Sequence, residues 1–94
     1  MPYQLIDPDE TLDYTFNWSA FLAEAGSPAD TIQSANWFVT PPGPLLSNQA
    51  NDASTATTFI SGAAQGQVYV LTNRVVTAAG RTAERSVTLA CENR

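Results

Sequence analysis

Residues 66–89 hold the feature that most constrains the fold: two long runs of strand-forming residues joined by one short turn. Val, Thr, Tyr and Leu dominate both runs, and these residue types suit a pleated surface. A two-residue loop of Ala79 and Gly80 would place Leu71 opposite Thr88, which sets an apolar side chain against a polar one. It would also require a positive φ at Ala79, which a Cβ disfavours.

A three-residue loop, Ala78–Gly80, avoids both problems. Gly80 then takes the left-handed position of a type I turn followed by a bulge. Apolar residues face apolar residues on one side of the hairpin, and opposite charges face each other on the other side. The predicted pairs are Tyr69 with Leu89, Leu71 with Val87 and Arg74 with Glu84. We expect a second sheet to pack on this hairpin.

The rest of the chain contains further short strands separated by Gly, Pro and Asn turns. Apolar residues alternate with polar ones from residue 12 to residue 18, which predicts a half-buried strand. Residues 31–39 and 55–60 are predicted strands, and residues 45–54 a polar connection in which Leu45 and Leu46 could start a short strand. Ser19 is placed to cap one short helical turn that ends at Gly26. The predicted core consists of Tyr14, Phe16, Trp18, Trp37, Ile60, Tyr69, Leu71, Val75, Val87 and Leu89.

This pattern predicts an all-β fold, an antiparallel immunoglobulin-like β-sandwich of six or seven strands. Trp37 falls in mid-strand, where such sandwiches place a core indole, and Tyr69 begins a long strand just after a turn, the position of a tyrosine corner. The 94 residues suit a single domain. We expect residues 1–11 to form an acidic N-terminal arm and residues 12–94 to form the sandwich.

Composition excludes several classes of function. The net charge of −5 and the absence of Lys argue against nucleic-acid binding, which needs a basic face. No stretch approaches the length of a membrane span, and the N-terminus lacks the basic and apolar regions of a signal peptide. Cys91 is the only cysteine, so an intrachain disulfide and a cysteine zinc site are both excluded. We expect Cys91 to serve as a small apolar residue.

The sequence contains no signature of an enzyme. There is no His and no Lys to act as the base of a nucleophile–base pair. Asp7, Asp9, Glu10 and Asp13 form a carboxylate cluster, but the loop lacks the Gly and the distal Glu of the helix–loop–helix calcium pattern. We expect no catalytic residues, no metal and no cofactor.

The charge is distributed unevenly along the chain. Residues 1–52 hold seven acidic residues and no basic one, whereas residues 53–94 hold four Arg and two Glu. We interpret the acidic arm as a docking surface for a basic partner, in which charge sets rate and selectivity and apolar side chains supply affinity. The alternatives are an acidic surface that is simply solvated, an arm that frays, or an arm that lies along the edge of the sandwich and protects it. The candidate partner-binding residues are Tyr3, Leu5, Ile6, Asp7, Asp9, Glu10 and Asp13.

Over nearly its whole length the chain resembles a family of small immunoglobulin-like structural proteins of tailed bacteriophages and prophages. The resemblance starts in the run from Asp7 to Ser19 and ends in the hairpin. Each matching piece is short, so the specificity lies in their order and spacing. The other pieces are Asp30–Ile32, Phe59–Gly62, Gly66–Tyr69, Thr72–Arg74 and Gly80–Ser86.

The resemblance implies a non-enzymatic virion protein that joins a tail or baseplate to a fibre through protein–protein contacts. Its partners would be tail, baseplate or fibre subunits, and it could also form a homo-oligomer within the virion. Before assembly it would reside in the host cytoplasm. Two alternatives stand beside it: a head decoration or head–tail connector protein, and a carbohydrate-binding accessory module. Trp18 and Trp37 fall on predicted core faces, which disfavours the carbohydrate module. The sequence does not separate a tail location from a head location.

Overall fold

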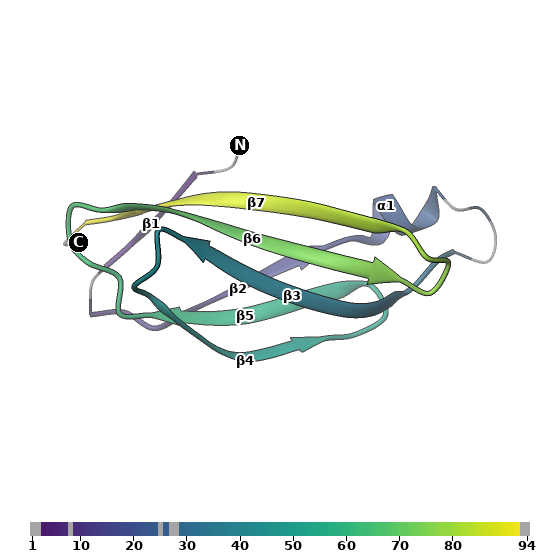
Figure 1. Ribbon diagram of the computed structural model, residues 1–94, viewed down its shortest axis with the longest axis horizontal. Helices are drawn as coiled ribbons and strands as arrows, with labels where there is room; N and C mark the ends of the chain where they lie inside the picture. Colours follow the sequence, from purple (N-terminus) through teal and green to yellow (C-terminus); the bar gives the residue numbers. More distant parts are fainter. Residues whose placement is uncertain (1–2, 8, 25, 27–28, 93–94) are drawn as a thin grey trace.

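Seven strands and one short helix make up the part of the chain that the computed structural model describes, residues 3–7, 9–24, 26 and 29–92. The strands form two sheets that face each other, with orders β1-β7-β6-β3 and β2-β5-β4, so the fold is an all-β sandwich (Figure 1). All neighbouring strands are antiparallel except β1 and β7, which are parallel. The elements are β1 (Tyr3–Ile6), β2 (Leu12–Asn17), α1 (Ser19–Ala23), β3 (Ile32–Thr40), β4 (Leu45–Asn51), β5 (Thr55–Ser61), β6 (Val68–Thr77) and β7 (Thr82–Cys91).

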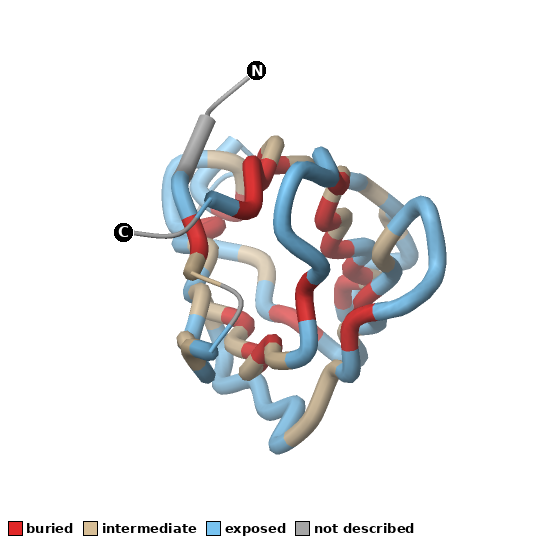
Figure 2. Tube along the Cα trace, turned by 90° about the vertical axis from the view of Figure 1, so that its left-hand side faces the viewer, coloured by how far each residue is buried: buried red, intermediate tan, exposed pale blue. Residues whose placement is uncertain are grey.

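The core lies between the two sheets because every second residue of the long strands points inward. In β6 the buried residues are the odd-numbered ones, Tyr69 to Thr77, and β5 buries its even-numbered ones. The tube view shows where the buried residues fall along the chain (Figure 2). Eight of the ten predicted core residues are buried, whereas Tyr14 and Phe16 are half-buried and pack against the core.

The predicted hairpin register is confirmed. Strands β6 and β7 pair Tyr69 with Leu89, Leu71 with Val87 and Arg74 with Glu84. The amide of Gly80 donates to the carbonyl of Thr77 (2.9 Å) and the amide of Thr77 donates to the carbonyl of Arg81 (2.8 Å). Gly80 has a φ of +90°, as the last position of the three-residue loop requires.

Tyr69 fixes the connection between β5 and β6. Its hydroxyl accepts a hydrogen bond of 3.1 Å from the amide of Ala64, five residues upstream. This contact runs from the start of a long strand back to the preceding turn. The ring itself is buried in the core. This one side chain therefore hydrogen-bonds to the turn and packs in the core.

The structure places the first part of the predicted arm along the edge of the sandwich, which was one of the alternatives that the sequence left open. Residues Tyr3–Ile6 do not lie outside the sandwich: they form β1, which lies along the edge of the larger sheet beside β7. Ile6 is fully buried in the core, and burial of this side chain explains why the segment docks. Between β1 and β2, the described residues Asp7 and 9–11 are not in a strand.

Two further expectations need correction. The segment predicted mainly as a polar connection contains the seven-residue strand β4, which pairs with β5. The register of this pair shifts between Ser47 and Ala50. Ser19 is not the cap of the helix but its first residue. The amide of Ser19 donates instead to the side-chain oxygen of Asn17 (2.9 Å), so the side chain two residues earlier satisfies this free amide.

Candidate partner-binding surface

Hydrogen bonds connect Asp7, Asp9 and Glu10 in the acidic link between β1 and β2. The amide of Glu10 donates to the carbonyl of Asp7 (3.0 Å), and the amide of Asp7 donates to the carboxylate of Glu10 (2.8 Å). The carboxylate of Asp7 also accepts from the amide of Asp9 (2.9 Å). Two of the candidate carboxylates therefore hold the turn, and they present its negative charge at a fixed place.

The seven candidate residues do not all reach the surface. Asp9 and Asp13 are exposed, and Leu5 is 39% exposed on β1. Ile6 is 0% exposed, so it belongs to the core and is set aside from the contact surface. The backbone of Tyr3 pairs with β7, but its side chain lies outside what the structure describes.

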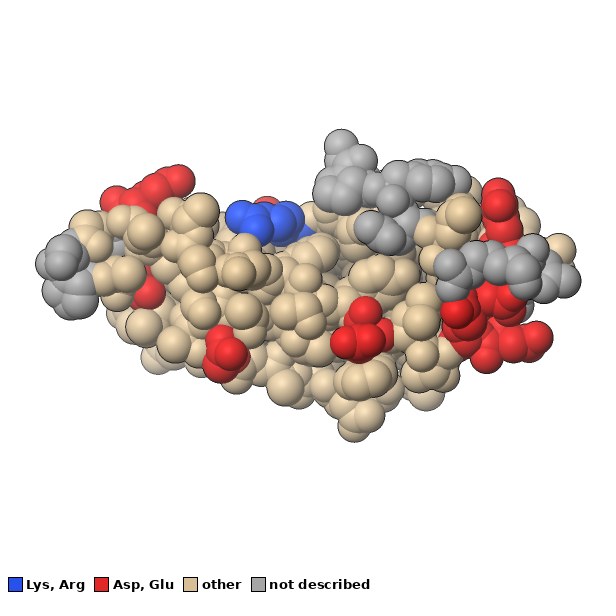
Figure 3. Space-filling view, turned by 180° about the vertical axis from the view of Figure 1, so that it is seen from behind, with Lys and Arg blue, Asp and Glu red and all other residues tan. Residues whose placement is uncertain are grey.

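Glu92 joins this acidic end from the far end of the sequence. Its amide donates to the carbonyl of Ile6 (2.9 Å), which places Glu92 beside the start of the acidic link. Asp7 also lies close enough to Cys91 to act on it: burial first, and then the charge of Asp7, raise the pKa of the Cys91 thiol. No local pattern could reveal the place of Glu92, because it follows from the pairing of the first strand with the last. Seen from behind, carboxylates gather at this end of the molecule (Figure 3).

Arg81 makes its contacts at the opposite end of the sandwich. Its guanidinium contacts the carboxylate of Asp30 (3.2 Å), donates to the carbonyl of Phe21 (3.2 Å) and lies 4.2 Å from the centre of the Phe21 ring. The side chain of Thr77, followed by the amides of Thr31 and Ala79 and then Arg81, lowers the pKa of Asp30. These contacts tie the tip of the β6–β7 hairpin to α1.

Arg85 also has a structural role. It donates to the carbonyl of Asn17 (2.9 Å) and lies 4.2 Å over the ring of Trp18. Both contacts run from β7 to the end of β2, so this side chain joins the edges of the two sheets. Arg74 belongs to the middle of β6 and faces Glu84. The contacts of these three Arg therefore lie away from the acidic end.

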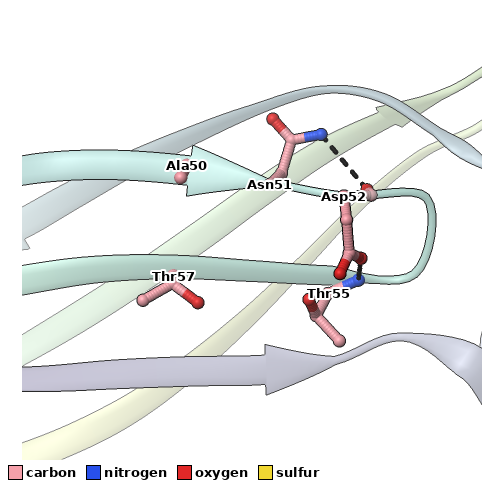
Figure 4. Close-up of a pocket in the computed structure, with 5 residues that line it drawn as sticks. All are labelled: Ala50, Asn51, Asp52, Thr55 and Thr57. Carbon is pink, nitrogen blue, oxygen red and sulfur yellow. Dashed lines mark hydrogen bonds between the residues drawn. The ribbon is translucent and has the colours of Figure 1, made fainter.

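A shallow hollow of about 220 Å³ lies along the β4–β5 hairpin, lined by Ala50, Asn51, Asp52, Thr55 and Thr57 (Figure 4). Asp52 uses its carboxylate to accept the amides of Ser54 (2.9 Å) and Thr55 (2.7 Å), and these two bonds lower its pKa. The hollow is smaller than the roughly 300–1,000 Å³ of ordinary ligand pockets, and its one carboxylate already holds the turn. We assign it no ligand.

The described part of the chain offers no metal centre, because no three potential ligands among His, Cys, Asp and Glu come together there. Within the same residues, no helix has the length and apolar character needed to cross a membrane.

Comparisons with known proteins give a family match and a likeness to solved structures. No curated protein matches the sequence. Among solved structures, the chain is similar to a 2,6-sialyltransferase of Photobacterium sp. JT-ISH-224, at a TM-score of 0.57 and 14% identity. The likeness covers 98% of this chain but only 17% of the sialyltransferase, and at this identity it concerns the fold alone.

The family match concerns the sequence itself and extends over almost its whole length. Residues 7–90 match the family described as podophage GP4 fiber-tail adaptor protein gp77. This range contains the acidic link and both sheets, apart from β1 and the last residue of β7. The chain belongs to the family of the podophage GP4 fiber-tail adaptor protein gp77.

Proposed function

We propose that this protein is a non-enzymatic adaptor that joins a phage tail or baseplate to a fibre by protein–protein contacts. The observation that carries the proposal is the family match over residues 7–90. The adaptor resides in the virion tail, and its partners are tail, baseplate or fibre subunits.

The acidic end supplies one contact surface for this function. It comprises the exposed Asp9 and Asp13, the turn carboxylates Asp7 and Glu10, and Glu92. A basic surface on a virion subunit is its expected complement, because opposite charges guide encounter and suppress wrong partners. Leu5 lies beside this charge and is exposed, so it can add apolar contact area.

The overall shape suits a connector. The sandwich extends 46 Å along its longest axis and 23 × 19 Å across it. The acidic end and the end formed by α1 and the hairpin tip lie far apart along this axis (Figure 1). Two partners can therefore contact the protein without contacting each other.

We also propose that the sandwich is immunoglobulin-like. The order β2-β5-β4 in one sheet and β7-β6-β3 in the other corresponds to strands B-E-D and G-F-C of that fold. The bond from Ala64 to Tyr69 stands at the corner between the fifth and sixth strands, where such folds place their conserved tyrosine.

The test is to delete the gene from the encoding phage and supply the protein in trans. The proposal predicts particles with normal heads that lack fibres, and recovery of the fibres with the parent protein. Recovery should fall with the double variant Asp9→Asn, Asp13→Asn, which removes two exposed charges. Fragile or incomplete heads with fibres still attached would instead support the head decoration or connector alternative.

A further inference from the structure

Strand β2 is the least protected edge of the sandwich. β1 and β3 are the edge strands of the larger sheet, and β2 and β4 those of the smaller one. β3 and β4 each contain a register shift and β1 has four residues, and irregular or short edges of this kind resist pairing with another chain. β2 pairs with β5 through all six of its residues without a shift. Its other side is therefore a regular template for a further strand.

The β2–β5 pairing determines which backbone groups point to this open side. The amide of Trp18 donates to the carbonyl of Ser54 (2.8 Å), which continues the register of the two strands. Bonded pairs alternate along an antiparallel ladder. The even-numbered residues of β2 therefore bond to β5, and the odd-numbered ones direct their N–H and C=O groups to the open side.

Two of the odd-numbered residues keep these groups available. The carbonyl of Asn17 accepts from the guanidinium of Arg85 (2.9 Å), so this end of the edge is occupied. The outward N–H and C=O groups of Asp13 and Thr15 have no hydrogen-bond partner among the described residues. The open part of the edge is therefore centred on Tyr14, between them.

The apolar side of β2 is also incompletely covered. Its even-numbered residues pack against the core but are only half-buried, namely Leu12, Tyr14 and Phe16. The residues that face them on β5 are all 0% exposed, namely Ile60, Thr58 and Ala56. Burial therefore decreases from β5 to β2, and a strand added beside β2 would remove further apolar surface from water.

We propose that β2 pairs with β2 of a second copy of this chain, antiparallel and about a two-fold axis beside Tyr14. Asp13 then lies opposite Thr15 of the second copy, and their outward N–H and C=O groups bond to each other. Tyr14 faces Tyr14 of the second copy as a non-hydrogen-bonded pair, with Cα atoms about 4.5 Å apart. Leu12 faces Phe16 on the same side. Both copies use the same surface, as a two-fold dimer requires.

The residues of β2 favour this register over its neighbours. A shift of the second strand by one residue would set its polar face against the apolar row. A shift by two residues in one direction places Asp13 opposite Asp13 of the second copy, and like charges directly opposite are destabilising. A shift by two in the other direction places Asp13 opposite Asn17, whose carbonyl already accepts from Arg85. The chain therefore carries, in its own β2, a strand that matches this edge.

The test measures the mass of the purified protein by analytical ultracentrifugation, at concentrations up to about 1 mM. Thr15→Pro removes an N–H that faces the open side, a position where an edge strand tolerates Pro. Thr15→Val is its matched control, because it also loses the hydroxyl contact with Thr57 (2.8 Å) but keeps the N–H. Phe38→Ser removes an exposed apolar side chain from the larger sheet and controls for non-specific association. Thermal melting shows whether each variant is folded.

We expect the parent protein to dimerise with a Kd of about 100 µM, because one strand pair makes a small interface. Thr15→Pro should weaken the dimer about tenfold or more through the lost backbone bonds. Thr15→Val and Phe38→Ser should stay within about twofold of the parent. Thr15→Arg should tighten the dimer about two- to tenfold, because the new charge faces Asp13 of the second copy.

Hydrogen exchange of the β2 amides gives a readout that needs no variant. The amides of Asp13 and Thr15 should exchange more slowly as the protein concentration rises. The amides of Tyr14 and Phe16 already bond to β5, so dimerisation should change their exchange less. If Thr15→Pro does not fold, this measurement and Thr15→Arg decide the question.

A parent protein that stays monomeric at about 1 mM would overturn the inference, and so would a dimer that folded Thr15→Pro leaves intact. A dimer that Thr15→Arg weakens would overturn the proposed register. A monomeric parent whose binding to a purified tail or fibre protein is lost in Thr15→Pro would assign the edge to a strand of that protein instead of a second copy. The inference goes beyond the adaptor function and does not depend on it, because the purified chain alone decides it.

Discussion

The indole N–H of Trp18 donates a hydrogen bond of 2.9 Å to the side-chain oxygen of Asn73 inside the sandwich. Trp18 follows β2 and Asn73 lies in β6, so this bond joins the two sheets. The amide nitrogen of Asn73 donates in turn to the carbonyl of Asn36 in β3 (3.0 Å). Both side chains are buried, and a buried polar group is tolerated only when it is paired in this way.

The two tryptophans should respond differently to the same substitution. The indole N–H of Trp37 is buried and has no hydrogen-bond partner among the described residues. Trp37→Phe therefore costs packing only, whereas Trp18→Phe also leaves Asn73 without its donor, at an added cost of about 1–3 kcal/mol. Chemical denaturation of both variants measures the difference.

Trp37→Ala, which removes the packing as well, should cost about 3–5 kcal/mol. Equal losses in the two Phe variants would show that the Trp18–Asn73 bond does not stabilise the fold. A Trp37→Ala variant that melts within a few degrees of the parent would show that Trp37 is not a core residue.

Two neighbouring residues of β1 should contribute differently to stability, because one side chain is buried and the other is exposed. Ile6→Ala removes a fully buried side chain and should cost about 2–5 kcal/mol. Leu5→Ala changes a side chain that is 39% exposed and should cost clearly less. Melting curves of the two variants test whether β1 belongs to the fold. The account of β1 would be wrong if both variants had the same melting temperature as the parent.

The Arg74–Glu84 pair should contribute little to stability. The two groups are 4.0 Å apart, and their side chains are 51% and 55% exposed. Solvent screening limits such a cross-strand pair to a coupling of about 0.2–1 kcal/mol. A double-mutant cycle with Arg74→Ala and Glu84→Ala measures it, and a cycle with Arg74 and Ser86 serves as the control. Stronger coupling in the control cycle would contradict the hairpin register.

Asp30 should make stability depend on acid pH. Its pKa is lowered from 3.8 in the folded protein, so below about pH 4 the unfolded chain binds protons more readily than the folded one. Stability from this group is present above pH 3.8 and is lost as the pH falls through the lower, folded-state pKa. Asp30→Asn should flatten the decline of the melting temperature between about pH 5 and pH 2. An unchanged slope in this variant, alongside the exposed control Asp9→Asn, would exclude the assignment.

The parts of the fold that were predicted correctly have local signals. Gly80 at the end of the loop and the apolar matches across the hairpin fix the β6–β7 register, and β5 and β6 show the alternation of half-buried strands. Trp37, Phe38 and Val39 are three consecutive apolar residues in β3. Because neighbouring strand residues point to opposite faces, Phe38 must point away from the core when Trp37 points into it. This run of apolar residues is therefore a local signal that Phe38 is exposed.

The parts that were missed depend on contacts distant in sequence or on weak patterns. β1 has four residues, too few for a period, and its partner is the last strand of the chain. β4 is an edge strand with four polar residues among its seven, a composition that resembles a loop. Glu92 reaches the acidic end only because β1 and β7 pair. Arg81 and Arg85 contact backbone carbonyls and aromatic rings. The distribution of charge along the sequence does not reveal such contacts.

The central claim is that this protein connects a tail to a fibre, and its position on the particle tests that claim most directly. Particles of the encoding phage are labelled with an antibody against this protein and viewed by negative-stain electron microscopy. The account predicts label where fibres meet the tail, and no label there on particles from the gene deletion. Label distributed over the capsid shell would contradict it.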